Sequence, residues 1–198
     1  MFTGIVQAVG RVMELKPAGQ AAAVTIDAGG LDLGDVAVGD SIACNGVCLT
    51  VTRRTRDGFS VDVSHETLRV TAGFAPGTAI NLEKSLRLAD RLGGHLVSGH
   101  VDGIGEVHKV NAVDGNCEMT IGFPRELGRY FARKGSVAVN GVSLTINALN
   151  ADSFSINLIP HTLAATNLGE LKKDSRVNLE VDLVARYVER MLGREEVR

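Results

Sequence analysis

The feature that most constrains this chain is an internal repeat. Residues 45–50 (NGVCLT) return as residues 140–145 (NGVSLT), an offset of 140 − 45 = 95 residues. At the same offset Gly4 falls on Gly99 and Thr67 falls on Thr162. The NLE block at 81–83 returns at 178–180, which implies a two-residue insertion between the blocks. The repeat indicates a duplication. Two copies predict two domains of one fold, because a solenoid needs at least three repeats.

Each half also contains segments in which apolar and polar residues alternate. Residues 59–63 (FSVDV) and 79–83 (AINLE) alternate in this way, as do their counterparts 154–158 (FSINL) and 177–182 (VNLEVD). Such alternation is typical of half-buried antiparallel strands. Turn residues separate the segments at 39–40 (GD), 57–58 (DG) and 114–116 (DGN). We therefore predict an all-β protein in which each half is a small closed barrel or a sandwich.

Three segments lie outside this pattern. Residues 84–94 join the halves, and Leu86, Leu88 and Leu92 with a closing Gly-Gly predict a short packed connector. Pro124 stands at a helix-start position, which predicts two helical turns over 124–131. The C-terminal segment carries an apolar stripe with charges opposite, formed by Leu183, Val184, Tyr187, Val188, Met191 and Leu192. That stripe fits a helix packed on its own barrel, or a helix that associates with copies of itself.

These observations predict three domains. Residues 1–96 form the first barrel with its connector, residues 97–184 form the second barrel, and residues 185–198 form a C-terminal helix for oligomerisation.

Composition and charge exclude several classes of protein. A net charge of −2 with 4% aromatic residues gives no electrostatic footprint for nucleic acid. The chain has no signal-peptide pattern at its N-terminus and no stretch approaching a membrane span of roughly 20 apolar residues. The three cysteines, Cys44, Cys48 and Cys117, have neither a disulfide pattern nor the spacing of metal ligands. We predict a cytoplasmic protein that binds no metal, nucleic acid or membrane.

Six strings together resemble riboflavin synthase of the trimeric α-chain type. They are residues 1–7 (MFTGIVQ), 45–50 (NGVCLT), 66–69 (ETLR), 93–102 (GGHLVSGHVD), 140–145 (NGVSLT) and 158–163 (LIPHTL). The resemblance covers essentially the whole chain, in order and at the spacing of the family. It implies two tandem six-stranded antiparallel Greek-key barrels followed by a trimer-forming α-helix.

The resemblance also implies a reaction. Two molecules of 6,7-dimethyl-8-ribityllumazine would give riboflavin and 5-amino-6-(D-ribitylamino)uracil, without a metal or organic cofactor. The implied active site lies between the first barrel of one subunit and the second barrel of a neighbour in a homotrimer. An association with lumazine synthase is implied as well. The duplication fits this reaction, because holding two identical molecules in a fixed geometry can contribute up to ~7–11 kcal/mol.

Cys48 and Ser143 differ at the same position of the repeat, so we expect them to contact the two ligands differently. The alternative for Cys48 is that of a small buried apolar residue, and Cys44 is interpreted as core. His100 replaces the Ile5 of the first half, and an imidazole suits acid–base work; a structural histidine is the alternative. We expect a structural role for His95. The predicted catalytic residues are His100, Cys48, Ser143 and Thr145.

The remaining candidates are ligand contacts. Thr50 and Thr145 would bind the pyrimidine edge, unless they only reflect strand propensity. Gly4 and Gly99 would bring backbone amides close to the ring, unless a turn requires them. Lys134 would reach a neighbour's ligand, unless it is an ordinary surface lysine. The full set is Gly4, Ile5, Val6, Cys48, Leu49, Thr50, Asp62, Val63, Ser64, His65, Glu66, Thr67, Gly99, His100, Val101, Lys134, Ser143, Leu144, Thr145, Asn157, Leu158, Ile159, Pro160, His161 and Thr162.

Two points qualify this set. The segments 62–67 and 157–162 resemble ribityl-binding segments, but Glu66 is matched by His161, where the family usually has an acid. Asp182 resembles a family acid near the site.

Two rival functions remain. A non-catalytic lumazine- or flavin-binding antenna protein would share the fold, but both halves here keep the NGVxLT motif. An oligosaccharide- or oligonucleotide-binding barrel is disfavoured by the few aromatic residues and the lack of a basic groove.

Overall fold

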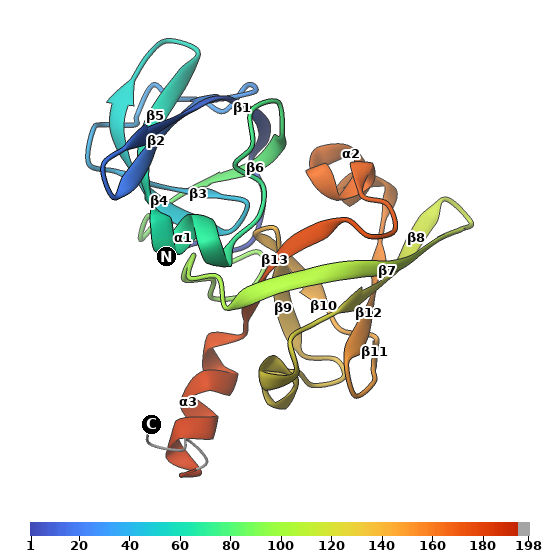
Figure 1. Ribbon diagram of the computed structural model, residues 1–198. Helices are drawn as coiled ribbons and strands as arrows, with labels where there is room; N and C mark the ends of the chain where they lie inside the picture. Colours follow the sequence, from blue (N-terminus) through green and yellow to red (C-terminus); the bar gives the residue numbers. More distant parts are fainter. Residues whose placement is uncertain (194–198) are drawn as a thin grey trace.

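The computed structural model describes residues 1–193, and its first half is a closed antiparallel barrel (Figure 1). Six strands close this barrel in the order β1-β2-β5-β4-β3-β6. Its elements are β1 (Ala8–Ala18), β2 (Ala21–Asp27), β3 (Ser41–Cys44), β4 (Val47–Arg54), β5 (Gly58–Ser64), α1 (His65–Val70) and β6 (Ala79–Lys84). Inward-facing residues at alternate positions of the strands fill the barrel, among them Val24, Ile42, Val51, Val61 and Ile80. The alternation in the sequence therefore predicted the core correctly.

The second half is a curled sheet of seven strands in the order β10-β9-β13-β7-β8-β12-β11. Its elements are β7 (Gly103–Val113), β8 (Asn116–Gly122), η1 (Arg125–Tyr130), β9 (Ser136–Val139), β10 (Val142–Thr145), β11 (Ala148–Leu149), β12 (Ser153–Leu158), α2 (Pro160–Ala165), η2 (Asn167–Glu170) and β13 (Arg176–Val181). Strands β10 and β11 together match β4, interrupted where β4 has its own register shift between Val51 and Arg53. The expected duplicated all-β fold is thus confirmed, with a more open second copy.

The two halves meet through equivalent residues. Asn45-Gly46 and Asn140-Gly141 have positive φ, as the tight turns of the β3–β4 and β9–β10 hairpins require. A Cβ on Gly46 would lie 2.8 Å from the backbone nitrogen of Gly141, so glycine allows these turns to touch. Phe2 pairs with Val97, its own counterpart in the repeat. The halves are therefore related by an approximate two-fold axis between the two hairpins.

A buried asparagine network lies at this junction. The side-chain nitrogen of Asn81 donates to the carbonyl of Asn140 and to Oδ1 of Asn167, each over 2.9 Å. Asn178 donates to the carbonyl of Asn45 over 3.0 Å. Because buried amides are costly unless paired, this network favours one relative placement of the two halves.

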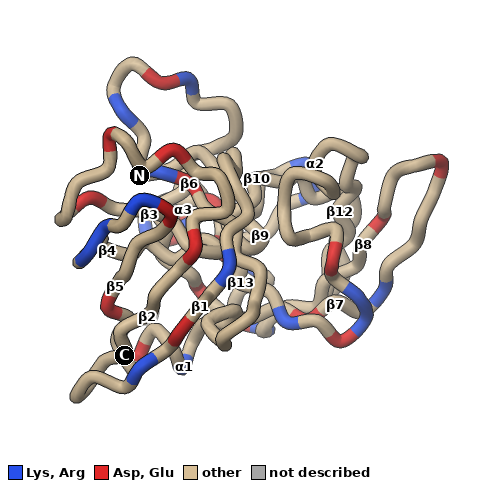
Figure 2. Tube along the Cα trace, turned by 90° about the horizontal axis from the view of Figure 1, so that it is seen from above, with Lys and Arg blue, Asp and Glu red and all other residues tan. Residues whose placement is uncertain are grey.

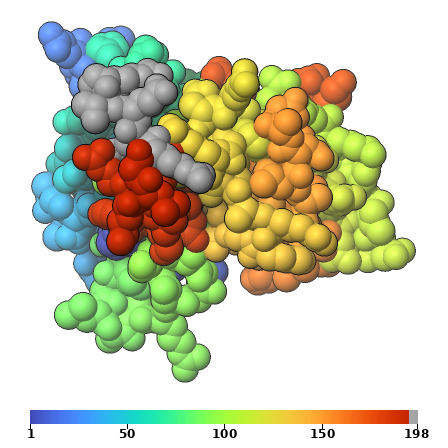
Figure 3. Space-filling model, turned by 90° about the horizontal axis from the view of Figure 1, so that it is seen from below, coloured from blue at the N-terminus to red at the C-terminus, as the bar shows by residue number. Residues whose placement is uncertain are grey.

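The connector between the halves differs from the prediction. Leu88 is fully exposed and Leu92 is 48% exposed, so these leucines do not pack on the body. The segment projects from the molecule (green, lower part of Figure 3). It is held at its ends by backbone hydrogen bonds from Leu86 to Met1 and from His95 to Thr3, and by an Arg87–Asp90 ion pair. Backbone pairing, and not leucine packing, fixes its course.

The two predicted helical segments are present. Residues 125–130 form the 3₁₀ helix η1 directly after Pro124, and helix α3 (Leu183–Met191) follows β13. Arg129 of η1 binds Glu189 of α3 over 2.7 Å, and Arg186 binds Asp102. Residues 194–198 of the predicted 185–198 helix lie outside the described part. Among the described residues, no helix is long and apolar enough to cross a membrane.

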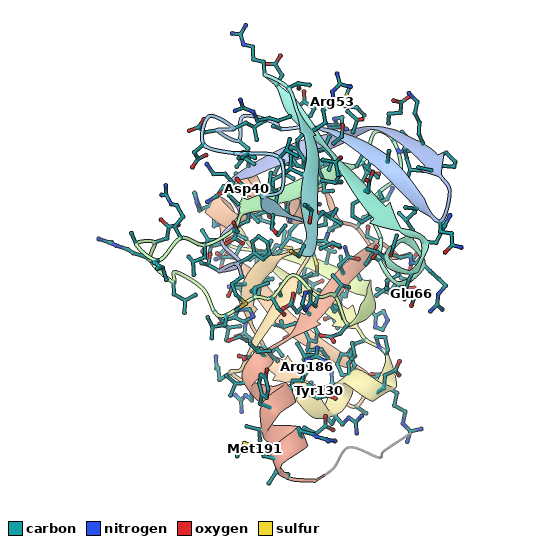
Figure 4. The ribbon with its side chains drawn as sticks, turned by 90° about the vertical axis from the view of Figure 1, so that its left-hand side faces the viewer. Asp40, Arg53, Glu66, Tyr130, Arg186 and Met191 are labelled. Atoms are coloured by element: carbon teal, nitrogen blue, oxygen red, sulfur yellow. The ribbon has the colours of Figure 1, made fainter. Side chains whose placement is uncertain are left out.

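Helix α3 presents its apolar stripe outward. Tyr187 is 63% exposed and Met191 is 85% exposed, while the charged side packs toward η1. Figures 1 and 3 show α3 (red) standing on the surface beside the second half. In Figure 4, Arg186 and Tyr130 lie where α3 meets the body, and Met191 lies near its free end. The alternative of a stripe packed on its own barrel is therefore wrong within this chain.

Candidate functional site

The segment that opens each half crosses to the other half. The amide of Cys48 donates to the carbonyl of Gly99 over 2.8 Å, and the amide of Ser143 donates to the carbonyl of Gly4 over 2.8 Å. Val101 packs against the core of the first half, and Val6 packs against the core of the second. Each NGVxLT motif is therefore completed by the opening segment of the opposite half.

Gly4 and Gly99 are required at these crossings. Both have positive φ, +75° and +82°, a backbone conformation that residues other than glycine rarely adopt. A Cβ on Gly99 would lie 2.6 Å from Cβ of Cys48, and a Cβ on Gly4 would lie 2.6 Å from Cβ of Ser143. Of the two explanations that the sequence left open, the turn requirement applies. The close approach seen here is to Cys48 and Ser143 of the opposite half.

The crossings correct two expectations. The amides and carbonyls of Gly4 and Gly99 are already engaged within the protein, so they are not free to bind a ring. His100 was assigned to the second half, but its neighbours Gly99 and Val101 contact the first half; its own side chain is exposed. Within residues 1–193, the backbone amides and carbonyls of Val6 and Val101 make no hydrogen bond. These groups are the free backbone partners that the sites offer.

In the first half the candidate residues share the outer face of the barrel. Cys48 is half-buried and Thr50 is exposed, on alternate positions of β4 whose intervening side chains face the core. Extending the Val51–Val61 pairing places Thr50 opposite Asp62 of β5. At the end of β5, the Ser64 hydroxyl accepts a hydrogen bond from the amide of Thr67 and caps α1. Cysteine, hydroxyl and carboxylate groups therefore line one outer face of the barrel, which we call the first face.

The second half has an equivalent face, which we call the second face, with different side chains. Ser143 is half-buried and Thr145 is exposed on β10, while Asn157 is exposed on β12. Ile159, Pro160 and His161 are exposed and Thr162 is half-buried at the start of α2. Ser143 and Asn157 stand where the first half has Cys48 and Asp62.

Some predicted contacts point away from these faces. The side chains of Leu49 and Val63 lie in the first core and that of Leu158 lies in the second, because they alternate with the outward positions. Leu144 packs against the second core as well. The buried side chains of Leu49, Val63 and Leu158 leave only their backbone groups to meet a ligand, and their assignment as ligand contacts stays a prediction.

The most specific polar pair in the second site joins His95 to Ser143. Nδ1 of His95 lies 2.7 Å from Oγ of Ser143, and Nε2 of His95 is buried without a partner. Burial lowers the pKa of His95, and the nearby Asp182 carboxylate opposes this shift. A neutral imidazole beside a hydroxyl can accept its proton. The geometry therefore adds a candidate proton-transfer role to the structural role expected for His95.

The other charged candidates occupy the surface. Glu66 forms an ion pair with Arg69 over 2.7 Å, which lowers the pKa of Glu66. Figure 4 shows Glu66 at the rim of the first half. Nε2 of His65 lies 3.2 Å from the carbonyl oxygen of Gly19. Asp182 caps α3 by accepting from the amide of Val184.

Lys134 adopts an unusual backbone conformation. Its φ is +67°, where the first half has Gly39 with φ of +100°. Its ammonium group lies 3.3 Å from Oδ1 of Asn147 and is otherwise exposed. A lysine held in the left-handed region costs free energy, and such strain often marks a functional position.

Ser41 is a residue of the first half that the sequence interpretation missed, and it pairs with Thr50 across β3 and β4. It also lines an open cavity of about 510 Å³ with Thr3, Ile5 and Lys84, although Cys48 and Thr50 do not line that cavity. Its size suits a small molecule. The signal was available, because Ser41 falls on Ser136 at the repeat offset.

Charge is distributed evenly over the molecule. Figure 2 shows Lys and Arg interspersed with Asp and Glu on both halves. Among residues 1–193, no three His, Cys, Asp or Glu side chains gather as metal ligands. All three cysteines are free, and burial raises the pKa of Cys44, which lies in the core as expected.

Comparison with known proteins identifies relatives along the whole chain. The model of the lumazine binding domain matches twice, at residues 3–85 and 98–182. The chain is 43% identical to riboflavin synthase of Photobacterium phosphoreum over 194 residues, covering 97% of this chain and 89% of that protein. It is 46% identical to riboflavin synthase of Mycobacterium tuberculosis over 198 residues, covering 97% and 98%.

Solved structures show the same fold. LumP in complex with 6,7-dimethyl-8-(1'-D-ribityl) lumazine aligns with a TM-score of 0.82 at 27% identity, covering 91% of this chain and 99% of that one. LumP in complex with riboflavin aligns with a TM-score of 0.84 at the same identity and coverage.

Proposed function

The chain belongs to the lumazine binding domain family and to the riboflavin synthases, and from this premise we propose that it catalyses the riboflavin synthase reaction. Two molecules of 6,7-dimethyl-8-ribityllumazine react; one gives up a four-carbon unit and leaves as 5-amino-6-(D-ribitylamino)uracil, and the other becomes riboflavin. The observation that carries the proposal is the pair of equivalent outer faces, one bearing Cys48 and the other Ser143. Two copies of one substrate need two such faces, and unlike roles need unlike groups.

The free backbone groups support a common mode of ring binding. Val101 on the first face and Val6 on the second each offer an unpaired amide and carbonyl. A donor and an acceptor on one residue match the alternating acceptors and donors of a pyrimidinedione edge. Thr50 and Thr145 are exposed beside them and add one hydroxyl to each face.

The ribityl chain would lie along the segments after β5 and β12. Its hydroxyls need several convergent donors and acceptors, which Asp62, Ser64 and Thr67 supply on the first face. Asn157 and Thr162 supply them on the second, where His161 replaces Glu66. The second face therefore lacks two carboxylates, because Asn157 stands in place of Asp62 and His161 in place of Glu66. We expect the two faces to bind the same ligand with different affinities.

Proton transfer in our scheme involves His95 and Ser143. The 7-methyl group of a lumazine must lose a proton, and the ring nitrogens must exchange protons during the reaction. His95 is neutral near pH 7 because burial lowers its pKa, and it lies 2.7 Å from the Ser143 hydroxyl. This pair is suited to hold and pass a proton at Ser143 Oγ. Cys48 and the exposed His100 belong to the opposite ligand, and the present geometry assigns Cys48 no covalent step.

An assembly would bring the two kinds of face together. Both lie open on the surface of a single chain, and α3 exposes an apolar stripe. We propose a homotrimer held by α3, in which the first half of one subunit faces the second half of the next. In this assembly the exposed Lys134, with its φ of +67°, would reach a neighbour's ligand. The domains 1–96, 97–184 and 185–198, a cytoplasmic location and an association with lumazine synthase remain predictions from the sequence.

Turnover tests the proposal. Purified protein is mixed with 6,7-dimethyl-8-ribityllumazine, and riboflavin is followed by its absorbance at saturating substrate. We expect riboflavin to form and the Ser143→Ala variant to form it much more slowly while still binding the lumazine. Binding without turnover in the unmodified protein would contradict the proposal and favour an antenna-type protein, as the likeness to LumP would then suggest.

A further inference from the structure

We propose that two buried glutamates, Glu83 and Glu180, are positioning residues, and that each acts on the ligand face of the opposite half. This inference rests on the proposed function only in treating the two faces as ligand sites. Glu83 belongs to β6 of the first half and Glu180 belongs to β13 of the second. They are 5% and 3% exposed, so each is almost completely removed from water.

Glu180 holds the segment that completes the Cys48 face. Its Oε1 accepts from the amide and the hydroxyl of Ser98, both over 2.6 Å, and its Oε2 accepts from the amide of Gly99 over 2.9 Å. The next peptide carbonyl, that of Gly99, accepts from the amide of Cys48. The carboxylate of the second half therefore fixes the backbone that presents Val101 to the first face.

Glu83 acts in the equivalent way on the opposite half. Its Oε1 accepts from the amide and hydroxyl of Thr3 over 2.7 Å, and its Oε2 accepts from the amide of Gly4 over 3.0 Å. Gly4 in turn accepts from the amide of Ser143. The carbonyl of Thr3 also accepts from the amide of His95 over 3.1 Å. One carboxylate thus sets both members of the Ser143–His95 pair.

The chemistry requires a carboxylate at these positions. Each glutamate receives three hydrogen bonds from donors on a single short segment, and two of those donors are backbone amides that no rotation can redirect. An amide side chain could accept at one oxygen but would present N–H groups to the third donor. Burial raises the pKa of both carboxyl groups, which means that keeping them ionised in the protein costs free energy. A buried carboxylate retained at a cost is consistent with a positioning role.

Amide hydrogen exchange tests the crossed assignment directly. The amides of Cys48 and Ser143 each report one crossing bond, because they donate to Gly99 and Gly4 respectively. Exchange at both amides is measured in the full chain for Glu180→Gln, for Glu83→Gln and for Glu118→Gln, a control on the exposed side of β8.

We expect Glu180→Gln to speed exchange at Cys48 about tenfold, the order expected for losing a hydrogen bond to a charged group, and to leave Ser143 unchanged. Glu83→Gln should do the reverse, and Glu118→Gln should change neither. Equal acceleration at both amides would mean general destabilisation and would overturn the proposal. So would no change, or a response confined to the half that carries the substitution.

A milder pair covers the case in which a glutamine variant does not fold. Ser98→Ala and Thr3→Ala each remove one of the three donors and leave the carboxylates in place. The same crossed pattern is expected with smaller changes, and its absence would again overturn the assignment. Since exchange needs neither ligand nor turnover, a failed riboflavin assay with crossed exchange would reject only the proposed function.

Discussion

The amide of Cys48 donates a 2.8 Å hydrogen bond to the carbonyl of Gly99, a residue of the other half of the chain. Ser143 and Gly4 repeat this relationship in the opposite direction. Neither half can therefore complete its ligand face alone, and the duplication creates a mutual dependence between the two copies. This dependence makes the glycines at the crossings sensitive positions.

Gly99→Ala should weaken both folding and activity. The alanine would have to adopt a positive φ, and its Cβ would lie 2.6 Å from Cβ of Cys48. Backbone strain and overpacking together should lower the free energy of unfolding by about 2–4 kcal/mol. Gly115→Ala is the matched control: it has φ of +79° but no neighbour within 4 Å, so only about 1 kcal/mol should be lost. Urea unfolding and the rate of riboflavin formation measure the difference. Equal losses in the two variants would show that the crossing is not tightly packed.

The activity should fall on the acid side as His95 becomes protonated. Burial lowers the pKa of His95 below its ordinary value of 6.5, so the neutral form persists to a pH below 6.5. Both the catalytic proton acceptor and the stability that neutral His95 contributes are present above pH 6.5 and are lost as pH falls through the lowered pKa. We expect an acid limb in kcat with a midpoint below 6.5.

Substitution identifies the group responsible for that limb. His95→Gln should abolish the limb and reduce kcat, whereas His108→Gln, an exposed histidine on β7, should leave the profile unchanged. A midpoint above 6.5, or an unaltered limb in His95→Gln, would argue against His95 as the titrating group.

Lys134→Gly should separate stability from activity. Glycine relieves the strain of φ at +67°, so we expect a gain of about 1 kcal/mol in the free energy of unfolding. Activity should fall because the ammonium group is lost. Asp174→Gly is the control, since Asp174 has φ of +69° and lies in the turn before β13, outside the set of predicted ligand contacts; it should gain stability without losing activity. A fully active Lys134→Gly variant would make Lys134 an ordinary surface lysine.

The apolar stripe of α3 should control assembly. Replacing Val188 and Met191 by Glu places two charges in a stripe that is exposed in the single chain, so the fold should survive while the trimer dissociates. Light scattering should show a smaller mass and the activity should fall with it. Val38→Glu alters an exposed valine on the first half and should change neither. An unchanged mass in the α3 variant would remove this helix from the interface.

Much of the fold follows from the sequence, because local patterns specify strands and turns. Alternation placed Val61 and Ile80 in the core, and Asn-Gly at 45–46 and 140–141 fits the hairpin turns. The sequence could not specify the crossing. The repeat offset aligns Gly4 with Gly99. It does not tell, however, whether each of these segments hydrogen-bonds to its own half or to the opposite half, because the local sequence pattern fits both.

The candidate site was predictable to a similar extent. Repeat positions located Cys48, Ser143 and the two threonines, since these lie inside the duplicated motif. His95 lies directly after the connector of residues 84–94, where no repeat position or period marks it, and only the folded geometry brings it to Ser143. Leu88 was wrongly predicted to be packed. The connector is held by backbone hydrogen bonds at its ends, so its course does not require that an apolar side chain such as Leu88 be buried.

Binding stoichiometry is the most direct test of two ligand faces per chain. Riboflavin, which is the product and does not react further, is titrated into the protein and followed by calorimetry. We predict two molecules bound per chain, with unequal affinities because the faces differ at Cys48/Ser143 and Glu66/His161. Saturation at a single molecule per chain, with one face left empty, would contradict the account.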